Sequence, residues 1–254
     1  MTRLALILVA TACLCSGCAA GPNPRDPYEK FNRKMYAFNE GVDKVILKPA
    51  AKVYDKVLPD RVQAGVTNFF SNLGVVVTTL NDAAQFKFSK VPVDLMRFAT
   101  NLVFGFGGIL DVATEMKIEN RQEDFGQTLG HWGVGSGPYL VLPILGPSSV
   151  RDGIAVPVDI YTYPTTLAED NPRLINSLFA LRLIDTRANL LAADQFFEQA
   201  GIDKYAFIRD ASLQRRESLV RDGAAPANDA PPASRQKSLR ELEEEDFGDE
   251  PAPN

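Results

Sequence analysis

A run of 26 residues, from Phe125 to Val150, contains no Asp, Glu, Lys or Arg. It is longer than a membrane-spanning helix needs to be, but it also contains six glycines and three prolines. A helix interrupted so often would leave backbone N–H and C=O groups unpaired in hydrocarbon. Irregular apolar backbone is tolerated at membrane depth only where protein shields it or where it lines a cavity. The run therefore indicates a protein that works at a membrane without crossing it as one helix.

The N-terminus has the layout of a secretory signal. An apolar stretch over residues 4–10 follows the single positive charge of Arg3, and it is too short to span a bilayer. Leu14 and several small residues then lead to Cys18, in an order similar to the lipobox of bacterial lipoproteins. The match is imperfect, because the usual pattern has Leu three places before the modified cysteine and this position is Cys15 here.

We expect residues 1–17 to be a lipoprotein signal peptide and residues 18–23 to be a lipidated linker. Cys18 is the predicted lipid anchor, and Cys13 is a weaker competing site. The alternative is an ordinary cleaved signal with incidental cysteines.

All three cysteines lie at or before position 18. If Cys18 is acylated, the mature chain has no free thiol, so a structural disulfide, a cysteine–metal site and a cysteine nucleophile are excluded. Acyl chains anchor a protein firmly, because each buried CH₂ contributes about 0.8 kcal/mol. Lipoproteins kept in the inner membrane usually carry Asp after the cysteine, whereas Ala19 follows here. The lipobox resemblance therefore implies sorting to the outer membrane, facing the periplasm.

The C-terminal end differs in composition from the rest of the chain. Residues 222–254 are rich in Pro and Ala and include the acidic run Glu241–Asp246. Low hydrophobicity with blocks of charge predicts a disordered acidic tail, which is either a solvated segment or a docking segment for a basic partner. Residues 24–221 remain for one folded domain of ordinary size. It has no basic stripe, so no nucleic-acid partner is expected.

Apolar residues recur at helical spacing along most of residues 24–221, which predicts an all-α domain. Three starts are predicted from capping residues: a capping box at Asp26-Pro27-Tyr28-Glu29, Ser89, and Asn171-Pro172. We also expect helix rather than strand over residues 74–84, a long amphipathic helix from Leu174 to Leu191, and a final helix over Asp203–Leu219. Interruptions are expected at Pro49, where the chain restarts, and between Pro157 and Pro164, which bound a loop or kinked segment. Tyr139–Leu142 is expected to be briefly extended.

Three segments are apolar almost all round: Gly74–Phe86, Phe98–Leu110 and Phe125–Val150. A helix of that kind is either buried deep in a large core or faces lipid. Because a domain of this size can hide only one or two such segments, we expect at least one of them to contact lipid.

The sequence lacks the common catalytic motifs. The only histidine is His131, and Ser136 does not lie in a Gly-x-Ser-x-Gly elbow. One histidine without a mature thiol makes a transition-metal site implausible, and no metal or other cofactor is expected. We interpret His131 as a packed, hydrogen-bonded residue, and the adjacent carboxylates Glu123-Asp124 as solvated residues of a helix.

Every second residue from Gly133 to Gly137 lacks a side chain. Such a segment bends freely and allows another group to approach closely. Together with the apolar residues that follow, it is a candidate mobile gate along an acyl-chain path. The candidate lipid-channel or gate residues are Gly133, Gly135, Gly137, Leu140, Leu142, Ile144 and Leu145. The alternative for each glycine is a tight loop that requires positive φ.

Several segments closely resemble one family, the MlaA (VacJ) outer-membrane lipoproteins. They are Asp26–Arg33 with Met35–Asn39, Asn68–Leu73, Arg97–Asn101, Gly107–Ala113, Asp124–Tyr139 continuing through Leu142-Pro143 and Gly146 to Arg151-Asp152, Thr186–Ala188 and Gln214-Arg215. The resemblance covers about residues 24–220 in order. The unusual lipobox and the long acidic tail depart from the family pattern.

The resemblance implies an all-helical ring or disc lying in the periplasmic leaflet of the outer membrane, with a central channel that is apolar on one side and polar on the other. It also implies an activity without covalent chemistry. A protein of this family takes mislocalised phospholipid from the outer leaflet of a Gram-negative outer membrane and passes it to a periplasmic carrier of the MlaC type, typically beside a trimeric porin. Two alternatives stay open: a membrane-anchored lipid hydrolase that uses Ser136 or His131, and a structural adaptor that only clamps porins.

Overall fold

The computed structural model describes residues 23–168, 170–200 and 203–223. The predicted signal peptide, the predicted anchor Cys18 and nearly all of the predicted acidic tail lie outside the described residues. The elements, in chain order, are α2 (Glu29–Val42), the π-helix η1 (Asp43–Leu47), α3 (Lys48–Val57), α4 (Asp60–Ala84), α5 (Val91–Val103), α6 (Val112–Glu115), α7 (Phe125–His131), β1 (Tyr139–Leu142), β2 (Gly146–Ser149), α8 (Val150–Thr162), α9 (Pro164–Leu167), α10 (Pro172–Ala188), α11 (Leu191–Ala200) and α12 (Lys204–Val220).

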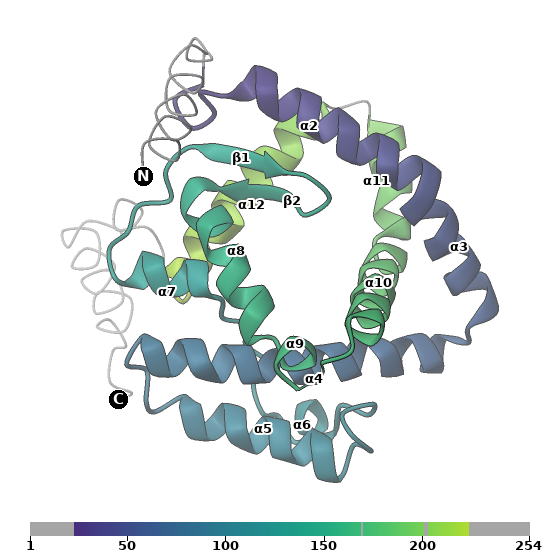
Figure 1. The fold of residues 1–254 in the computed structure, drawn as a ribbon, viewed down its shortest axis with the longest axis vertical. Coiled ribbons are helices and arrows are strands. Elements are labelled where there is room, and N and C mark those ends of the chain that lie inside the picture. Colours follow the sequence, from purple (N-terminus) through teal and green to yellow (C-terminus); the bar gives the residue numbers. More distant parts are fainter. Residues whose placement is uncertain (1–22, 169, 201–202, 224–254) are drawn as a thin grey trace, which may run out of the picture.

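The helices are arranged as a ring (Figure 1). α2, η1 and α3 form one continuous arm, α4 crosses the opposite side, and α8 and α10 lie on either side of the opening between them. α5 and α6 pack outside α4, and α12 lies behind the β-hairpin. The predicted helical ring is thus confirmed, with one two-stranded antiparallel hairpin added to it.

The helix start predicted at Asp26 is wrong. α2 begins at Glu29 after a turn, and Tyr28 at its N-cap makes no side-chain capping hydrogen bond. Asp26 is fully buried, and its carboxylate accepts hydrogen bonds from Asn32 and from the hydroxyl of Tyr205. The carboxylate therefore joins α2 to α12 instead of capping a helix.

Pro49 does not restart the chain, because it lies in the first turn of α3, where its fixed φ fits a helix and its missing N–H is not needed. Ser89 is not a cap either, since α5 begins at Val91 with Lys90 as the N-cap. A turn closed by the Lys90 N–H to the Lys87 carbonyl delays that helix, and Pro92 occupies its first turn.

The longer helical predictions are confirmed. α4 runs unbroken through the segment that had strand propensity, Asn171 caps α10 at the Arg173 N–H, and Asp203 caps α12. The loop or kinked segment predicted between Pro157 and Pro164 is mostly helical, because Pro157 lies inside α8, which runs to Thr162; the chain breaks only at the extended Tyr163, before Pro164 begins α9. The amphipathic helix predicted to reach Leu191 is divided, because α10 ends at Ala188 and α11 follows.

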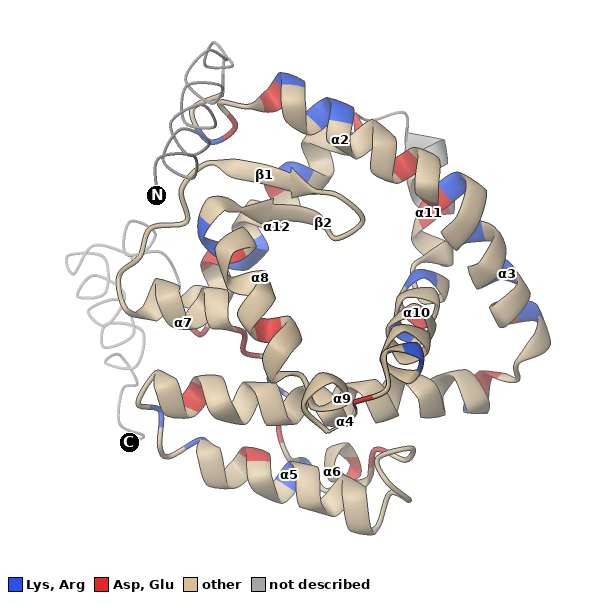
Figure 2. Ribbon diagram, viewed as in Figure 1, with Lys and Arg blue, Asp and Glu red and all other residues tan. Residues whose placement is uncertain are grey.

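The ring has no single large hydrophobic core. Among the described residues, 12 hydrophobic and 18 polar or charged residues are buried. Two small apolar clusters join the elements: Ala51, Tyr54 and Ala188 between α3 and α10, and Tyr139, Val141 and Tyr205 between the hairpin and α12. Many large hydrophobic side chains are exposed instead, and charged residues are sparse on α4, α5 and the hairpin (Figure 2).

The turn after α5 shows the exposed apolar surface most clearly. Val103, the last residue of α5, is 68% exposed, and Phe104 and Phe106 in the turn are 67% and 76% exposed. This turn belongs to the predicted all-round apolar segment Phe98–Leu110, and its contact with lipid stays a prediction. Within the part of the chain that the structure describes, no helix combines the length and the apolarity required to cross a membrane.

Candidate functional site

The uncharged run forms α7, a glycine-rich loop, the β-hairpin and the first residue of α8. Residues 133–137 of the loop are all exposed. Gly133 and Gly137 have φ of +89° and +66°, so the tight-loop alternative describes these two positions. Gly135 has neither a positive φ nor any atom within 4 Å of the place where a Cβ would lie. It is the position in the loop where a side chain is tolerated most easily.

The hairpin holds the other candidate residues. Tyr139 and Val141 of β1 are buried on one face, whereas Leu140 and Leu142 alternate with them and are half-buried. Ile144 and Leu145 form the tip and are about half exposed, at 51% and 47%. The tip reaches into the opening of the ring (Figure 1). The structure thus brings the seven candidates into two groups, the exposed glycine loop and the hairpin with its apolar tip.

A cavity of about 790 Å³ lies beside the glycine loop. The loop forms one wall, one face of α8 with Asp152 and Asp159 forms a second, and α12 with Arg216 forms a third. Arg25, Arg151 and other charged residues complete its lining, so that the cavity contains both signs of charge.

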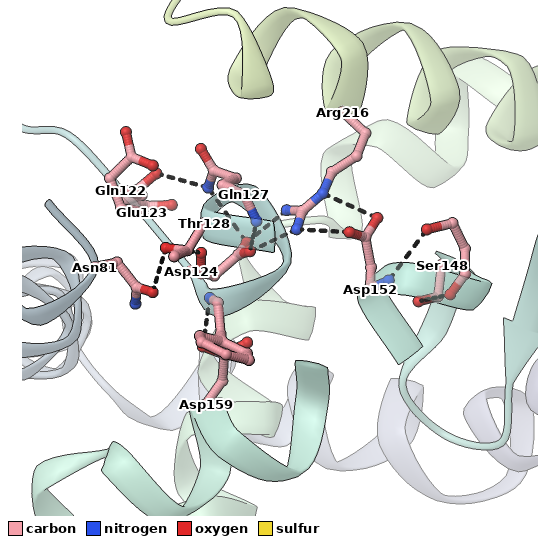
Figure 3. A network of polar contacts seen from close by, with 12 residues as sticks. Asn81, Gln122, Glu123, Asp124, Gln127, Thr128, Ser148, Asp152, Asp159 and Arg216 are labelled. Carbon is pink, nitrogen blue, oxygen red and sulfur yellow. Dashed lines mark hydrogen bonds and ion pairs between the residues drawn. The ribbon is translucent and has the colours of Figure 1, made fainter. Parts of the chain in front are cut away.

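Asp124 is the centre of a polar network at this cavity (Figure 3). Its carboxylate caps α7 by accepting the Gln127 N–H at 2.9 Å, and it forms an ion pair with Arg216 of α12. Arg216 also contacts Asp152 of α8 at 3.0 Å. Burial alone raises the pKa of Asp124, but the hydrogen bonds and charge of Arg216 outweigh this and leave its pKa below the ordinary value. Asp159 accepts the Phe125 N–H at 2.8 Å, and burial raises its pKa to about 6.

The prediction that Glu123 and Asp124 are solvated is therefore wrong. Glu123 is only 8% exposed, lies before α7, and accepts a hydrogen bond from Gln85 at 2.9 Å. Gln85 and Arg216, which bind these two carboxylates, are far away in the sequence, so the adjacency of Glu123 and Asp124 does not predict their surroundings.

A second buried charge cluster joins α4 to α5. Arg121 contacts Asp82 at 3.0 Å and Asp94 at 2.8 Å, and both carboxylates are almost completely buried. Burial and the neighbouring Asp82 raise the pKa of Asp94 to about 6. The cluster fastens the α4–α5 pair and the segment that leads to α7.

The prediction that His131 is packed is wrong, because it is exposed at the end of α7. Ser136 is exposed in the glycine loop, where its carbonyl accepts the Arg151 N–H at 3.1 Å. Neighbouring Trp132 donates its Nε1–H to the Ala84 carbonyl at 3.1 Å and ties this end of α7 to α4. Sequence reasoning missed the two asparagines of α2, Asn32 and Asn39, which hydrogen-bond the hairpin. Their spacing of two helical turns on one face is the signal that could have found them.

The fold and the site together define a class: a ring-shaped, mostly helical domain with extensive apolar surface, an exposed glycine loop and an apolar hairpin tip in its opening. The model of the MlaA lipoprotein family matches residues 24–219. The chain belongs to the MlaA lipoprotein family.

Relatives in several bacteria are similar to the chain. The Escherichia coli K12 protein named intermembrane phospholipid transport system lipoprotein MlaA is 32% identical over 251 residues, which cover 96% of this chain and 99% of that protein. Its namesake in Haemophilus influenzae is 33% identical and covers 87% of this chain and 92% of its own length. An uncharacterized protein of Rickettsia bellii is 36% identical over 77% of this chain and 76% of its own length.

One solved structure is also similar. It comes from a study of the structural basis for maintenance of bacterial outer membrane lipid asymmetry. The TM-score is 0.66 with 32% sequence identity, and the match covers 77% of this chain and 98% of that chain.

Proposed function

We propose that this chain is an outer-membrane lipoprotein that removes mislocalised phospholipid from the outer leaflet and passes it through an amphipathic channel to a periplasmic carrier. This retrograde transport would maintain the lipid asymmetry of the outer membrane. The observation that carries the proposal is the relation to the E. coli phospholipid-transport lipoprotein, which extends over 96% of the chain. The finer parts of the proposal are the anchor at Cys18, the periplasmic face, a neighbouring trimeric porin and a carrier of the MlaC type.

The physical task is to keep acyl chains away from water while the lipid leaves its leaflet. Each CH₂ exposed to water costs about 0.8 kcal/mol, so the two chains of a phospholipid sum to more than about 20 kcal/mol. A passage with an apolar wall lowers this barrier, and a polar wall keeps the head group hydrated. Transfer of this kind breaks no covalent bond.

α8 has the two faces that such a passage requires. Ile154, Val158 and Tyr161 share one face at helical spacing and are exposed. Asp152 and Asp159 lie on another face and line the charged cavity. Because α8 borders the opening in Figure 1, we assign its apolar face to the acyl-chain path and its polar face to the head-group side.

The two other readings of the sequence gain no support from the relatives. The named relatives are lipoproteins of a transport system, so the family is a transport family rather than an enzyme family. Release of fatty acid from phospholipid that disappears in a His131→Ala variant would favour a hydrolase. Purified protein that carries no phospholipid would favour a porin adaptor.

The test uses a Gram-negative host that lacks its own family member. Expression of the full chain is expected to lower the phospholipid on the cell surface, measured with a membrane-impermeant amine label. Gly135→Ile fills the open space in the loop and is expected to lose most of this effect. Gly74→Ile is the matched control, because it adds the same side chain at an equally open position on α4.

Failure of the wild-type chain to lower surface phospholipid would contradict the proposed transport. A folded Gly135→Ile variant as active as the wild type would contradict the assignment of the glycine loop as a gate.

A further inference from the structure

The edge of β1 that faces away from β2 is covered by two side-chain amides of α2. Asn32 donates from Nδ2 to the Tyr139 carbonyl at 3.0 Å and accepts the Val141 N–H at Oδ1 at 2.9 Å. Asn39 repeats this pattern with the next part of the hairpin. Because an amide carries one acceptor and one donor group side by side, Asn32 replaces the hydrogen bonds that a neighbouring strand would supply to β1, and Asn39 supplies the same pair of hydrogen bonds to the turn after it.

The two asparagines differ in what they hold. Asn32 is fully buried and also donates to Asp26, so it is part of the buried packing between α2 and the hairpin. Asn39 is only half-buried. It donates to the Leu142 carbonyl and accepts the Ile144 N–H, both at 2.8 Å, and therefore holds the turn rather than the strand.

That turn has an unfavourable backbone conformation. The Leu145 N–H donates to the Pro143 carbonyl at 2.7 Å, which closes a γ-turn around Ile144. Ile144 has φ of +65°, a region that β-branched residues strongly avoid. Such a conformation persists only where neighbouring contacts enforce it, and enforced outliers of this kind occur at switches and clamps.

The turn carries exposed apolar side chains into the opening. Ile144 and Leu145 are about half exposed, and the tip points into the ring (Figure 1). The tip thus combines exposed apolar side chains, a disfavoured backbone conformation and a half-buried side chain, Asn39, that hydrogen-bonds both sides of the turn. These are the features of an element that can adopt a second position. The contacts of Asn32 at the base would stay formed while the tip moves.

We propose that Asn39 is a positioning residue that clamps the hairpin tip across the lipid path, and that release of its two hydrogen bonds lets Ile144 and Leu145 move aside. The inference rests on the proposed transport function for the identity of the path. The clamp itself is a property of the fold that can be measured without lipid transfer.

Amide hydrogen exchange of the full-length protein in phospholipid nanodiscs tests the clamp. Asn39→Ala removes both hydrogen bonds, so exchange at the Ile144 amide is expected to become at least about tenfold faster, while exchange at Val141 stays as slow as in the wild type. Asn39→Asp keeps the acceptor for the Ile144 N–H and should give an intermediate rate. Asn68→Ala is the control, because Asn68 is also half-buried and its amide holds a different turn, at the Ile109 carbonyl at 3.1 Å.

Unchanged exchange at Ile144 in Asn39→Ala would overturn the clamp. Equal acceleration at Ile144 and Val141 would also overturn it, because it would indicate general destabilisation of the hairpin.

The second measurement is the transfer of fluorescent phospholipid from vesicles that contain the full-length protein to albumin. Asn39→Ala is expected to raise the rate several-fold over the wild type, and Asn68→Ala is not. If hydrogen exchange shows that the tip is released in Asn39→Ala but the rate of phospholipid transfer is unchanged or slower, the tip does not block the lipid path. If the wild-type protein transfers no phospholipid, the proposed function fails, while the exchange data still decide whether Asn39 clamps the turn.

Discussion

Buried polar side chains hold this ring together at places where a globular domain would use a hydrophobic core. Arg97 of α5 is 2% exposed, contacts both carboxylate oxygens of Asp111 at 2.8 Å, and donates to the Ile118 carbonyl at 2.7 Å. Asn101 adds hydrogen bonds to Asp111 and to the Ala113 N–H. These bonds connect α5 to the segment that follows the exposed apolar turn, and so hold both ends of that turn.

Arg97→Ala is expected to destabilise the fold by about 3 kcal/mol, because removal of one partner leaves a partly buried carboxylate uncompensated. Thermal unfolding in detergent measures the change. Arg173→Ala, at an exposed arginine of α10, is the control and should stay within about 0.5 kcal/mol of the wild type. A loss of stability in Arg97→Ala no larger than that in Arg173→Ala would show that the Arg97–Asp111 ion pair contributes little.

Asp159 predicts a pH dependence. Burial raises its pKa from 3.8 to about 6, so between these values the folded state binds more protons than the unfolded state, and the free energy of unfolding decreases as pH rises. Asp159→Asn keeps an oxygen acceptor for the Phe125 N–H but does not titrate. The variant should match the wild type near pH 4 and exceed it by about 1–2 kcal/mol above pH 6, after allowance for partial exposure. Denaturant titrations at several pH values measure this, and parallel curves for the two proteins would contradict it.

At the scale of elements, the sequence predicts correctly those helices that are determined by residues within or next to them. The periodicity of α4, the Asn171 cap of α10 and the Asp203 cap of α12 all lie within a few residues of what they determine. The predictions that are wrong concern residues whose partners are distant in the sequence. Asp26 hydrogen-bonds Tyr205, and Asp124 pairs with Arg216, so partners distant in sequence decide their roles.

The same reasoning applies to the candidate site. The glycine loop and the apolar tip could be found from composition, because flexibility and hydrophobicity are properties of the residues themselves. The amide contacts of Asn32 and Asn39 could not, because they require the hairpin to lie along α2.

Gly135 and Gly137 of the loop should respond differently to replacement by alanine. Gly137 has φ of +66°, and a Cβ there would approach the Val150 Cβ to 3.2 Å, so Gly137→Ala is expected to cost about 1–2 kcal/mol. Gly135→Ala meets open space and should be neutral or slightly stabilising, since it restricts the unfolded chain. Chemical denaturation distinguishes the two variants. Equal losses would show that the loop is uniformly strained rather than constrained at Gly137.

At the scale of the whole molecule, the ring exposes apolar side chains that a globular domain in water would bury. A protein whose surroundings are apolar gains nothing from hiding every hydrophobic side chain, and it must satisfy its polar groups internally. This chain buries more polar than hydrophobic residues in its described part and places many large apolar side chains on the surface. In a water-soluble domain the large apolar side chains are the ones most often buried, so their exposure here gives a physical reason for the proposed place in a lipid leaflet.

The turn after α5 provides a direct test of that place. Phe104 and Phe106 are 67% and 76% exposed, so replacing either with Asp should not disturb folding. If the turn lies among acyl chains, each replacement removes roughly 1.5–3 kcal/mol of apolar burial and adds the cost of a charge, which predicts at least about a tenfold loss of binding to phospholipid vesicles. Gln214→Asp, on an exposed position of α12, adds the same charge and serves as the control. The measurement is vesicle flotation of protein whose proposed anchor has been removed by Cys18→Ser. Equal binding by wild type, Phe106→Asp and Gln214→Asp would place this turn outside the membrane, and the apolar surface of the ring would then have to face a protein partner.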